Sequence, residues 1–381
     1  MRGDPATALR LNKLESLYNL VVELDRTFAI EPPAGIELLP LGAAEERTLA
    51  WIDDTFGGSW SSEAYAGTNV VGYRTGAPVG FATIDARGMS FAWLDGLARQ
   101  RSVGIFGPLG VAGGERGNGL GRALLASALD GLRARGYARA VIAAVGEERL
   151  VRFYSEAVGA RVAERFDRPA LIRPSRRTLV LASGNGSNFQ AVLDASHSGA
   201  LPLEIAGLLV NDPAAYAIER ARNAGMDSVQ VLCWNRSTES RAEYDVRLLE
   251  AATSAQPDLV LLLGWMHLLS DSFVGAFPEM LNLHPAFLPL DPQRDEVVVP
   301  DGTQIPAFRG PRAVRDALAA SSKWVGATLH RVTNATDRGP VMARRPLRVQ
   351  PGEEEHHLME RVHGLERDVV RAGLMRWSYE R

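Results

Sequence analysis

The sequence predicts an α/β protein of two modules, an N-terminal mixed-sheet α+β domain followed by a doubly wound domain with a mainly parallel sheet. From residue 178 onward, almost continuously apolar segments alternate with segments of helical spacing, which is typical of a parallel sheet covered by helices on both faces. Between 36 and 168, shorter strand-like runs surround one clear helix, GRALLASALDGLRARG. No internal repeat relates the halves, so we interpret the chain as a fusion of unrelated modules.

We divide the chain into four parts. Residues 1–35 are interpreted as an amphipathic helix and a linker, because apolar residues recur at three- and four-residue spacings over 9–28. Residues 36–168 and 178–381 form the two modules, and the proline- and arginine-rich segment 169–177 joins them. The first helix has two interpretations, packing on the neighbouring module or formation of a homodimer.

Composition narrows the function. A formal net charge of −3 gives no electrostatic reason to expect nucleic acid or an anionic membrane as a partner. Neither a signal-peptide pattern nor an apolar run of the length of a membrane helix is evident, so we expect a cytoplasmic protein. The single cysteine, Cys233, lies in the apolar run VQVLCW and is expected to be a buried structural thiol.

A glycine-rich segment of the first module, GPLGVAGGERGNGLGRALL, follows an apolar strand and opens a helix. Glycines permit a tight turn, and the free amides of a helix start attract an anion such as a pyrophosphate. The R-x-x-G-x-G pattern resembles the loop that binds acetyl-CoA in the GNAT superfamily of acetyltransferases. Its residues here are Arg116, Gly117, Asn118, Gly119 and Gly121.

The GNAT resemblance covers about residues 36–167 and implies acetyl-CoA as a cofactor. It also implies that the strand around Val111 presents backbone groups to the pantetheine arm. In RFYSEAVGARV, Tyr154 takes the place of the family's general acid. The first module contains no histidine, so a carboxylate or a water chain would have to act as the general base.

The second module opens with LVLASGNGSNFQAVL, a strand, a glycine turn and a helix that starts at Gly186, Ser187 and Asn188. Free amides beside a hydroxyl and a side-chain amide predict an anion pocket, although a simple capped turn would show the same pattern. The segment matches neither a Walker loop nor a dinucleotide-binding fingerprint.

Polar residues follow further apolar strands of this module. Asn282 and His284 end one strand, His330 ends another, and Asp337 lies in the polar loop after it. Ligands of open α/β sheets collect at strand ends, so we expect these side chains to converge. An amide, an imidazole and a carboxylate are suited to acyl transfer to an amine, because they can stabilise an oxyanion and manage protons.

Four motifs, SGNGSN, LLGWMHLLS, NLHPAFLP and GATLHRVTNATDRGPV, resemble those of the folate-dependent formyltransferases, nearest the glycinamide ribonucleotide formyltransferases, over residues 178 to about 377. The resemblance implies 10-formyltetrahydrofolate as a cofactor and a small-molecule amine as the acceptor. It assigns catalysis to Asn282, His284 and Asp337, and places the substrate phosphate at the 186–188 helix start. Cofactor contacts fall on Met266, His267 and Leu268, where His267 replaces the arginine usual in the family.

Two further residues are assigned to substrate binding. Glu366 stands where the family has a glutamate that contacts the amine, and His330 aligns with a histidine near the site, although a core histidine is the alternative. His356 and His357 are interpreted as solvated surface residues, and no zinc-type spacing of ligands is present, so no metal is expected.

Residues 290–306 depart from the family pattern, in which the histidine motif leads almost directly to a short F-x-G element. This insert carries four acids and one arginine, and its PDG turn between β-branched residues predicts a small hairpin. It is either a tolerated surface loop or, as we expect, a lid or wall that reshapes the amine site.

These patterns predict a bifunctional acyl-transfer enzyme of specialised metabolism. It would formylate the amine of a small molecule from 10-formyltetrahydrofolate and carry a fused acetyl-CoA-dependent N-acetyltransferase. Two alternatives stay open at this point: formylation of glycinamide ribonucleotide in purine synthesis, and a GNAT module that binds acyl-CoA without catalysis.

Overall fold

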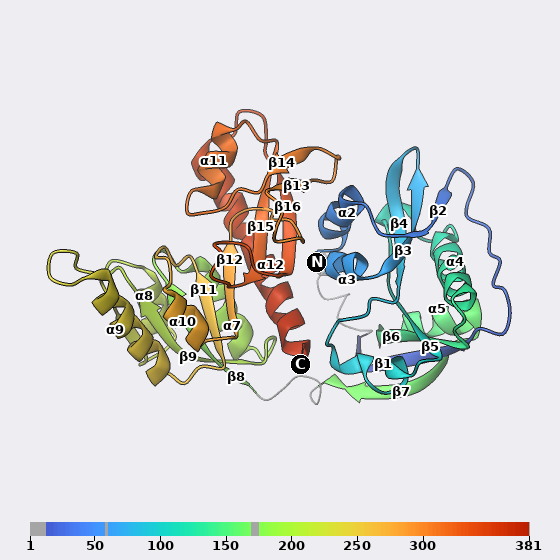
Figure 1. Ribbon diagram of the computed structural model, residues 1–381, viewed down its shortest axis with the longest axis horizontal. Coiled ribbons are helices and arrows are strands. Elements are labelled where there is room, and N and C mark those ends of the chain that lie inside the picture. Colours follow the sequence, from blue (N-terminus) through green and yellow to red (C-terminus); the bar gives the residue numbers. More distant parts are fainter. Residues whose placement is uncertain (1–12, 58–59, 169–174, 381) are drawn as a thin grey trace, which may run out of the picture. The chain divides into compact units, whose positions relative to one another are not determined.

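The computed structural model describes residues 13–57, 60–168 and 175–380. Contacts within the chain divide it into two units, a first unit that reaches residue 172 and a second that covers essentially 173–378. Each unit contains one seven-stranded sheet with its own core (Figure 1).

The sheet of the first unit has the strand order β2-β3-β4-β5-β6-β1-β7. Its strands are β1 (Lys13–Glu23), β2 (Glu37–Gly42), β3 (Thr68–Arg74), β4 (Ala77–Ile84), β5 (Val103–Val111), β6 (Arg139–Glu147) and β7 (Arg161–Asp167). All neighbouring strands run antiparallel except β5 and β6, which are parallel. This is the mixed sheet expected of the first module.

The N-terminal segment is a strand, so the predicted helix over 9–28 is wrong for 13–23, and residues 9–12 lie outside the described part. β1 pairs with both β6 and β7 in the interior of the sheet. Its apolar residues, including Leu20 and Val22, are buried in the core. Tertiary pairing overrides the helical spacing here, because hydrogen bonding to the edges of β6 and β7 stabilises an extended segment. The prediction of a dimer-forming helix therefore loses its basis for 13–23, and residues 13–35 are part of the sheet unit.

The helices of the first unit are α2 (Glu46–Phe56), α3 (Trp60–Ala66), α4 (Leu120–Ala134) and α5 (Glu148–Val158), with short 3₁₀ turns η1 (Ala92–Leu94), η2 (Gly96–Arg99) and η3 (Gly113–Glu115). The core cluster formed by leucines of α4, such as Leu124 and Leu129, also contains Phe106 of β5 and Tyr154 of α5. α4 and α5 thus share this core with one face of the sheet.

The sheet of the second unit has the order β10-β9-β8-β11-β12-β15-β16. Its strands are β8 (Arg176–Ala182), β9 (Leu203–Val210), β10 (Val229–Val231), β11 (Leu259–Leu263), β12 (Met280–His284), β15 (Trp324–Arg331) and β16 (Val341–Arg348). The first five are parallel, and β15 and β16 are antiparallel additions at one edge. The linker predicted at 169–177 lies mostly outside the described residues, and β8 already begins at Arg176.

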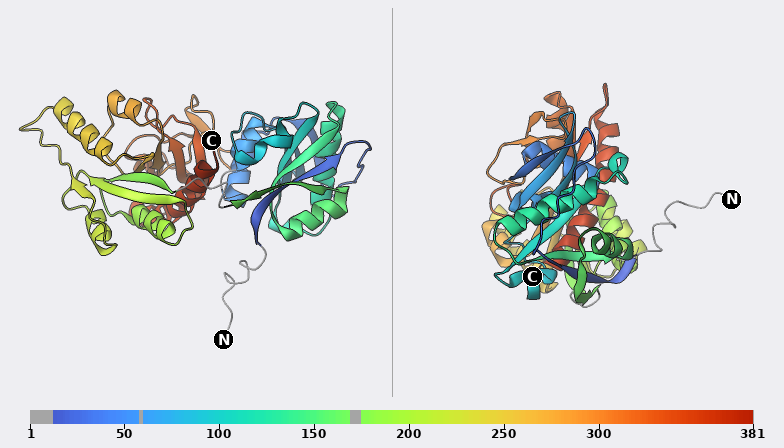
Figure 2. Two further views of the ribbon diagram at one scale, coloured as in Figure 1. Left: turned by 90° about the horizontal axis from the view of Figure 1, so that it is seen from below. Right: turned by 90° about the vertical axis from the view of Figure 1, so that its right-hand side faces the viewer.

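Helices cover both faces of this sheet, as the doubly wound prediction requires (Figure 2, left). They are α7 (Ser187–His197), α8 (Ala217–Asn223), α9 (Arg241–Ser254), α10 (Asp271–Ala276), α11 (Ala313–Ala319) and α12 (Glu355–Tyr379). Residues of α7, α8 and α12 share one core cluster, and residues of α9 and α10 share another. The near-continuous apolar strands are explained by this two-sided burial.

The insert contains the expected hairpin, formed by β13 (Glu296–Val298) and β14 (Gln304–Pro306). Cys233, by contrast, is exposed, so its prediction as a buried thiol is wrong. It lies just after the short edge strand β10, where the chain leaves the sheet. None of the described helices is long and apolar enough to span a membrane.

Candidate functional site

Three polar side chains of the second unit converge on the carboxylate of Asp337. Asn282 and His284 are two residues apart on β12, so their side chains lie on the same face of the sheet. The strand register places Asn282 directly opposite His330 of β15. Asp337 lies in the loop between β15 and β16. Its Oδ1 is 3.2 Å from Nδ2 of Asn282 and 3.5 Å from Nε2 of His330, and its Oδ2 is 3.6 Å from Nδ1 of His284.

The amide of Asn282 is oriented by its two acceptors. Nδ1 of His330 lies 2.8 Å from the carbonyl oxygen of Arg331, so this nitrogen carries a proton and Nε2 is the acceptor in the neutral ring. Nδ2 of Asn282 then donates to Nε2 of His330 at 3.2 Å and to Asp337 at 3.2 Å. His330, only 2% exposed, is therefore a residue that positions Asn282 from behind.

Burial and neighbouring charges determine the protonation states of His284 and Asp337. Burial lowers the pKa of His284 and outweighs the opposing effect of Asp337. Burial alone would raise the pKa of Asp337, but the nearby imidazoles of His330 and His284 and the hydrogen bond from the amide of Gly310 hold it well below its usual range. The resting site thus holds an ionised Asp337 beside a neutral His284 whose Nε2 donates to the carbonyl of Phe308 at 2.8 Å. A proton added at Nδ1 would face the carboxylate.

The backbone of residues 308–310 clamps this pair. The carbonyl of Phe308 accepts from His284, and the amide of Gly310 donates to Oδ2 of Asp337 at 2.8 Å. Between them, Nε of Arg309 donates to the backbone carbonyl of Asp337 at 3.1 Å. Asp337 itself has a left-handed φ of +53°, a conformation that costs energy for a residue with a side chain and is found preferentially at functional sites.

The glycine start of α7 is built for a close approach. Gly186 has φ +73°, and a side chain there would meet Ala217 of α8 at 2.7 Å, so only glycine fits. Ser187 and Asn188 begin the helix, whose first amides have no partner within the helix. Arg220 anchors on Asn185, donating to its backbone and side-chain oxygens at 2.8 and 2.9 Å, and so adds positive charge beside this turn.

A buried carboxyl group faces the same helix start. Glu366 of α12 is 5% exposed and accepts a hydrogen bond of 2.7 Å from Nδ2 of Asn188. Burial raises the pKa of Glu366 to about 7. The side-chain oxygen of Asn188 is buried without a hydrogen-bond partner, an unmet acceptor of the kind that a ligand donor satisfies. The predicted residues Asn188 and Glu366 are therefore joined in one polar site.

The segment after β11 exposes apolar side chains beside these elements. Met266 and Leu268 are 56% and 69% exposed, while the amide of Met266 is held by Oγ of Ser183 at 3.0 Å. His267 packs against Tyr244, Trp265 and Trp234, with ring centroids 5.6 to 6.2 Å apart, and burial lowers its pKa. Nε1 of Trp265 is buried without a partner. Exposed apolar groups next to an unmet donor suit a flat heteroaromatic ligand.

In the first unit, β5 and β6 separate partway along their length. Their parallel pairing ends at Phe106 and Ile142, although β5 continues to Val111 and β6 to Glu147. Beyond that point β5 pairs only with β4, and β6 pairs with β1. The backbone of β5 toward Val111 therefore borders an opening in the sheet. The carbonyl of Val111 accepts from Nε of Arg116 at 3.1 Å.

The glycine loop leads from this opening into α4. Gly117 and Gly119 have φ of +83° and +98°, which other residues rarely adopt. Gly121 is helical, and a methyl group there would make only ordinary contacts at 3.7 Å. The side chain of Asn118 accepts from the amide of Leu120 at 3.1 Å, which fixes the loop at the helix start.

An acid that the sequence analysis missed lies within this loop. Glu115 is held by Arg74 and Asn118 at 2.6 and 2.7 Å. The hydrogen bond from Arg74 lowers the pKa of Glu115, so the carboxylate stays ionised but is paired with a cation. The pairing removes much of the repulsion that this acid would exert on an anionic ligand.

Tyr154 lies at the narrow end of the opening. Its ring packs edge-on against Phe106, the last paired residue of β5, at 6.2 Å, and against Phe153 at 5.1 Å. Burial raises the pKa of Tyr154, so its hydroxyl stays protonated, as a general acid requires.

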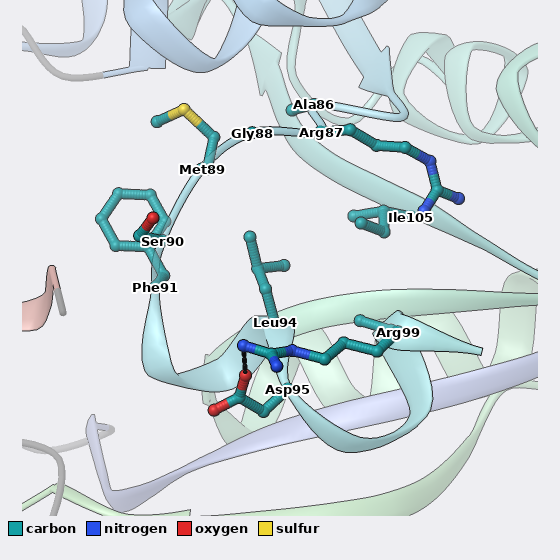
Figure 3. Close-up of a pocket in the computed structure, with 11 residues that line it drawn as sticks. Ala86, Arg87, Gly88, Met89, Ser90, Phe91, Leu94, Asp95, Arg99 and Ile105 are labelled. Carbon is teal, nitrogen blue, oxygen red and sulfur yellow. Dashed lines mark ion pairs between the residues drawn. The ribbon is translucent and has the colours of Figure 1, made fainter. Parts of the chain in front are cut away.

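Two other features of the described residues are not assigned a function. One is an open cleft near the start of β5, bordered by Arg87, Met89 and Phe91 (Figure 3). Leu94 points into this cleft, and Arg99 forms an ion pair with Asp95 at its edge. Glu354, His356 and His357 are the one described grouping that could offer three metal ligands, and all three side chains are exposed.

Comparison with known proteins matches each of the two units to a protein family. Residues 176–290 and 302–373 match the formyl transferase family model, and 33–160 match that of the acetyltransferase (GNAT) family. The phosphoribosylglycinamide formyltransferase of Mycobacterium tuberculosis is 35% identical over 209 residues, which are 54% of this chain and 87% of that protein. The chain belongs to the formyl transferase family.

The second unit is thus a formyl transferase domain, and the first is a GNAT domain. The Escherichia coli phosphoribosylglycinamide formyltransferase is 32% identical to the former over 185 residues, covering 48% of this chain and 78% of that protein. Glycinamide ribonucleotide transformylase 1 from Symbiobacterium toebii shares 32% identity over 52% of this chain and 86% of its own, with a TM-score of 0.45. The formyl transferase match skips residues 291–301, inside the insert.

Sequence reasoning missed three groups around the formyl transferase site. These groups are the hydrogen bond from the amide of Met266 to Oγ of Ser183, the unmet donor of Trp265 and the clamp formed by 308–310. They depend on contacts between distant segments. No local sequence pattern reveals that the backbone amide of Gly310 donates to the carboxylate of Asp337.

Proposed function

We propose that the formyl transferase domain moves a formyl group from 10-formyltetrahydrofolate to the amine of a small molecule of specialised metabolism. The observation that carries this proposal is the convergence of Asn282, His284 and His330 on the ionised Asp337. Supporting it are the exposed Met266 and Leu268 and the unmet donor of Trp265, which fit a pterin ring system.

The roles of the chain's own residues follow from their geometry. When bound, the folate supplies the formyl carbon that the amine attacks. Nδ2 of Asn282, held by two long bonds of 3.2 Å, can exchange one of them for an acyl oxygen that gains negative charge. The proton lost by the amine can be held by His284 and Asp337 together, because a proton on Nδ1 faces the carboxylate at 3.6 Å.

The amine would lie near Glu366 and Asn188. A carboxyl group whose pKa is about 7 can accept a hydrogen bond from an amine and exchange a proton with it near neutrality. The unmet oxygen of Asn188 offers a second acceptor. The anion-binding helix start at Gly186 suits an acidic group elsewhere on the same substrate.

Glycinamide ribonucleotide is the second candidate acceptor, favoured by the complete 186–188 helix start and by the similar proteins of M. tuberculosis and E. coli. The insert favours a different amine, because its acids Asp291, Glu296 and Asp301 add negative charge to a segment tied to the catalytic loop. Such charge disfavours a ribotide phosphate.

Formylation of glycinamide ribonucleotide by the whole chain decides between these acceptors. We expect a kcat/KM below about 10³ M⁻¹s⁻¹, under the range usual for enzymes acting on their own substrates. Formation of the formylated ribotide would be followed by mass spectrometry, with a panel of other amines in parallel. A value of about 10⁴ M⁻¹s⁻¹ or more would identify the ribotide as the substrate and reject specialised metabolism.

For the GNAT domain we propose acetyl-CoA-dependent transfer to an amine, with Tyr154 as the general acid. In Tyr154→Phe, we expect acetyl-CoA binding, measured by calorimetry, to change by less than about threefold. Acetyl transfer to the best amine of the panel should fall by about 10²-fold, since proton donation to the leaving thiolate is lost. Binding by the wild type without turnover of any amine would instead favour a non-catalytic acyl-CoA-binding module.

A further inference from the structure

The insert is packed onto the formyl transferase domain rather than projecting from it. Val297, Val299 and Ile305 of the hairpin are buried, at 3%, 0% and 6% exposed. Its tip is fixed by Asp301, whose carboxylate accepts from Nε1 of Trp324 at 2.8 Å. Buried apolar contacts on both strands of the hairpin, together with this tip contact, leave little freedom for it to open and close.

One side chain joins the insert to the catalytic loop. The guanidinium of Arg309 donates through Nε to the carbonyl of Asp337 at 3.1 Å, through Nη2 to the carbonyl of Arg294 at 2.7 Å, and through Nη1 to Asp295 at 3.1 Å. The side chain of Arg309 is only 14% exposed, so these bonds are well shielded from water. A planar guanidinium holds its donors in fixed directions, toward acceptors in different places, whereas the donors of a lysine all lie on one nitrogen atom.

A second arginine, Arg338, also connects the Asp337 loop to the insert. Arg338, directly after the catalytic aspartate, pairs with Asp295 and donates to the carbonyl of Pro292 at 3.0 Å. Asp295 is 74% exposed, so its ion pairs alone contribute little. The shielded backbone acceptors are the stronger part of the connection.

We propose that Arg309 is a positioning residue that fastens the insert to the Asp337 loop, making the insert a fixed buttress of the catalytic carboxylate. The inference rests on formyl transfer by this site. It assigns residues 291–301, which the family match skips, a role in holding Asp337 in its left-handed conformation. The buttress supports the clamp formed by 308–310 and does not depend on which amine is formylated.

The test compares Arg309→Ala and Arg309→Lys with Arg312→Ala, a control at an exposed arginine three residues away. Hydrogen–deuterium exchange on the whole chain should rise at least about threefold for peptides covering 332–340 and 291–301 in Arg309→Ala, and stay unchanged in the control. In turnover of the best acceptor, kcat should fall about 10- to 100-fold, because a small displacement of a catalytic group has a large effect on rate. KM for the folate should change less than threefold, and Arg309→Lys should recover only part of kcat.

The exchange measurement separates this inference from the proposed function. If the wild type formylates no amine but exchange still rises around 332–340, formyl transfer fails while the buttress stands as a structural connection. Unchanged exchange in Arg309→Ala, or an effect confined to KM for the amine, would overturn the positioning role. In a Glu296→Gln variant, which alters an acid that bonds to Gln304 within the hairpin, hydrogen–deuterium exchange over 332–340 should match that of wild type.

Discussion

Replacing Asp337 by Asn should lower kcat for formyl transfer by about 10²- to 10⁴-fold, the range expected when a positioned proton-handling group is lost. The carboxylate accepts from Asn282 and Gly310 and faces two imidazoles. An asparagine of the same shape presents one amide nitrogen toward these donors, so one of them loses its acceptor. It also removes the negative charge that supports a proton on His284. Single-turnover formylation with the best acceptor measures the effect.

The control for this substitution is Asp316→Asn, an exposed aspartate of α11. Folate binding measured by calorimetry should be within about threefold of wild type for both variants, which shows that the fold is intact. A formylation rate for Asp337→Asn within threefold of wild type would remove the carboxylate from the mechanism.

Replacing Glu366 by Gln should raise stability at pH 8 by up to about 3 kcal/mol and raise the KM for the amine. Burial raises the pKa of Glu366 from an ordinary 4.5 to about 7, so the folded state binds a proton that the unfolded state has released. Stability from this group is therefore fully present below pH 4.5 and is lost as the pH rises to about 7, at about 1.4 kcal/mol for each unit. A neutral glutamine has no such loss.

Calorimetric unfolding of wild type and Glu366→Gln at pH 5 and pH 8 tests whether the stability gain of the variant increases with pH. Most of the gain should disappear at pH 5, where the wild-type carboxyl group is still protonated in the fold. Glu360→Gln, at an exposed glutamate of the same helix, makes the same change in charge and should give no pH-dependent gain. Equal stability differences at both pH values would show that Glu366 is ionised or satisfied in the fold.

Secondary structure could be predicted where it follows from a repeating or alternating pattern of apolar residues. It could not be predicted where contacts with distant segments determine the conformation. Strand β11 is apolar and buried along its whole length because both sheet faces are covered, so a continuous apolar run predicts such a strand. The segment around Leu20 has helical spacing, yet it forms a strand because β6 and β7 leave room for it. Local spacing contains no information about an edge contributed by residues more than a hundred positions later.

The candidate site shows the same division. Asn282, His284 and Asp337 could be predicted because strand ends and motif order place them. The supporting roles of His330 and Arg309 could not, because one depends on the register between β12 and β15 and the other on how the insert folds back. Motifs identify the candidate chemical groups, whereas tertiary contacts identify the residues that hold those groups in place.

The interior position of β1 has a consequence for the order in which the GNAT domain is completed. The strand synthesised first pairs with two strands that end at Glu147 and Asp167. Within the GNAT domain, β1 has no partner until β6 is complete at Glu147, and its second side stays unpaired until β7 is complete at Asp167. Closing such a distant pairing is slow because the chain entropy of a long loop must be lost first. The GNAT sheet can therefore close only when its last strand emerges, just before synthesis of the formyl transferase domain begins.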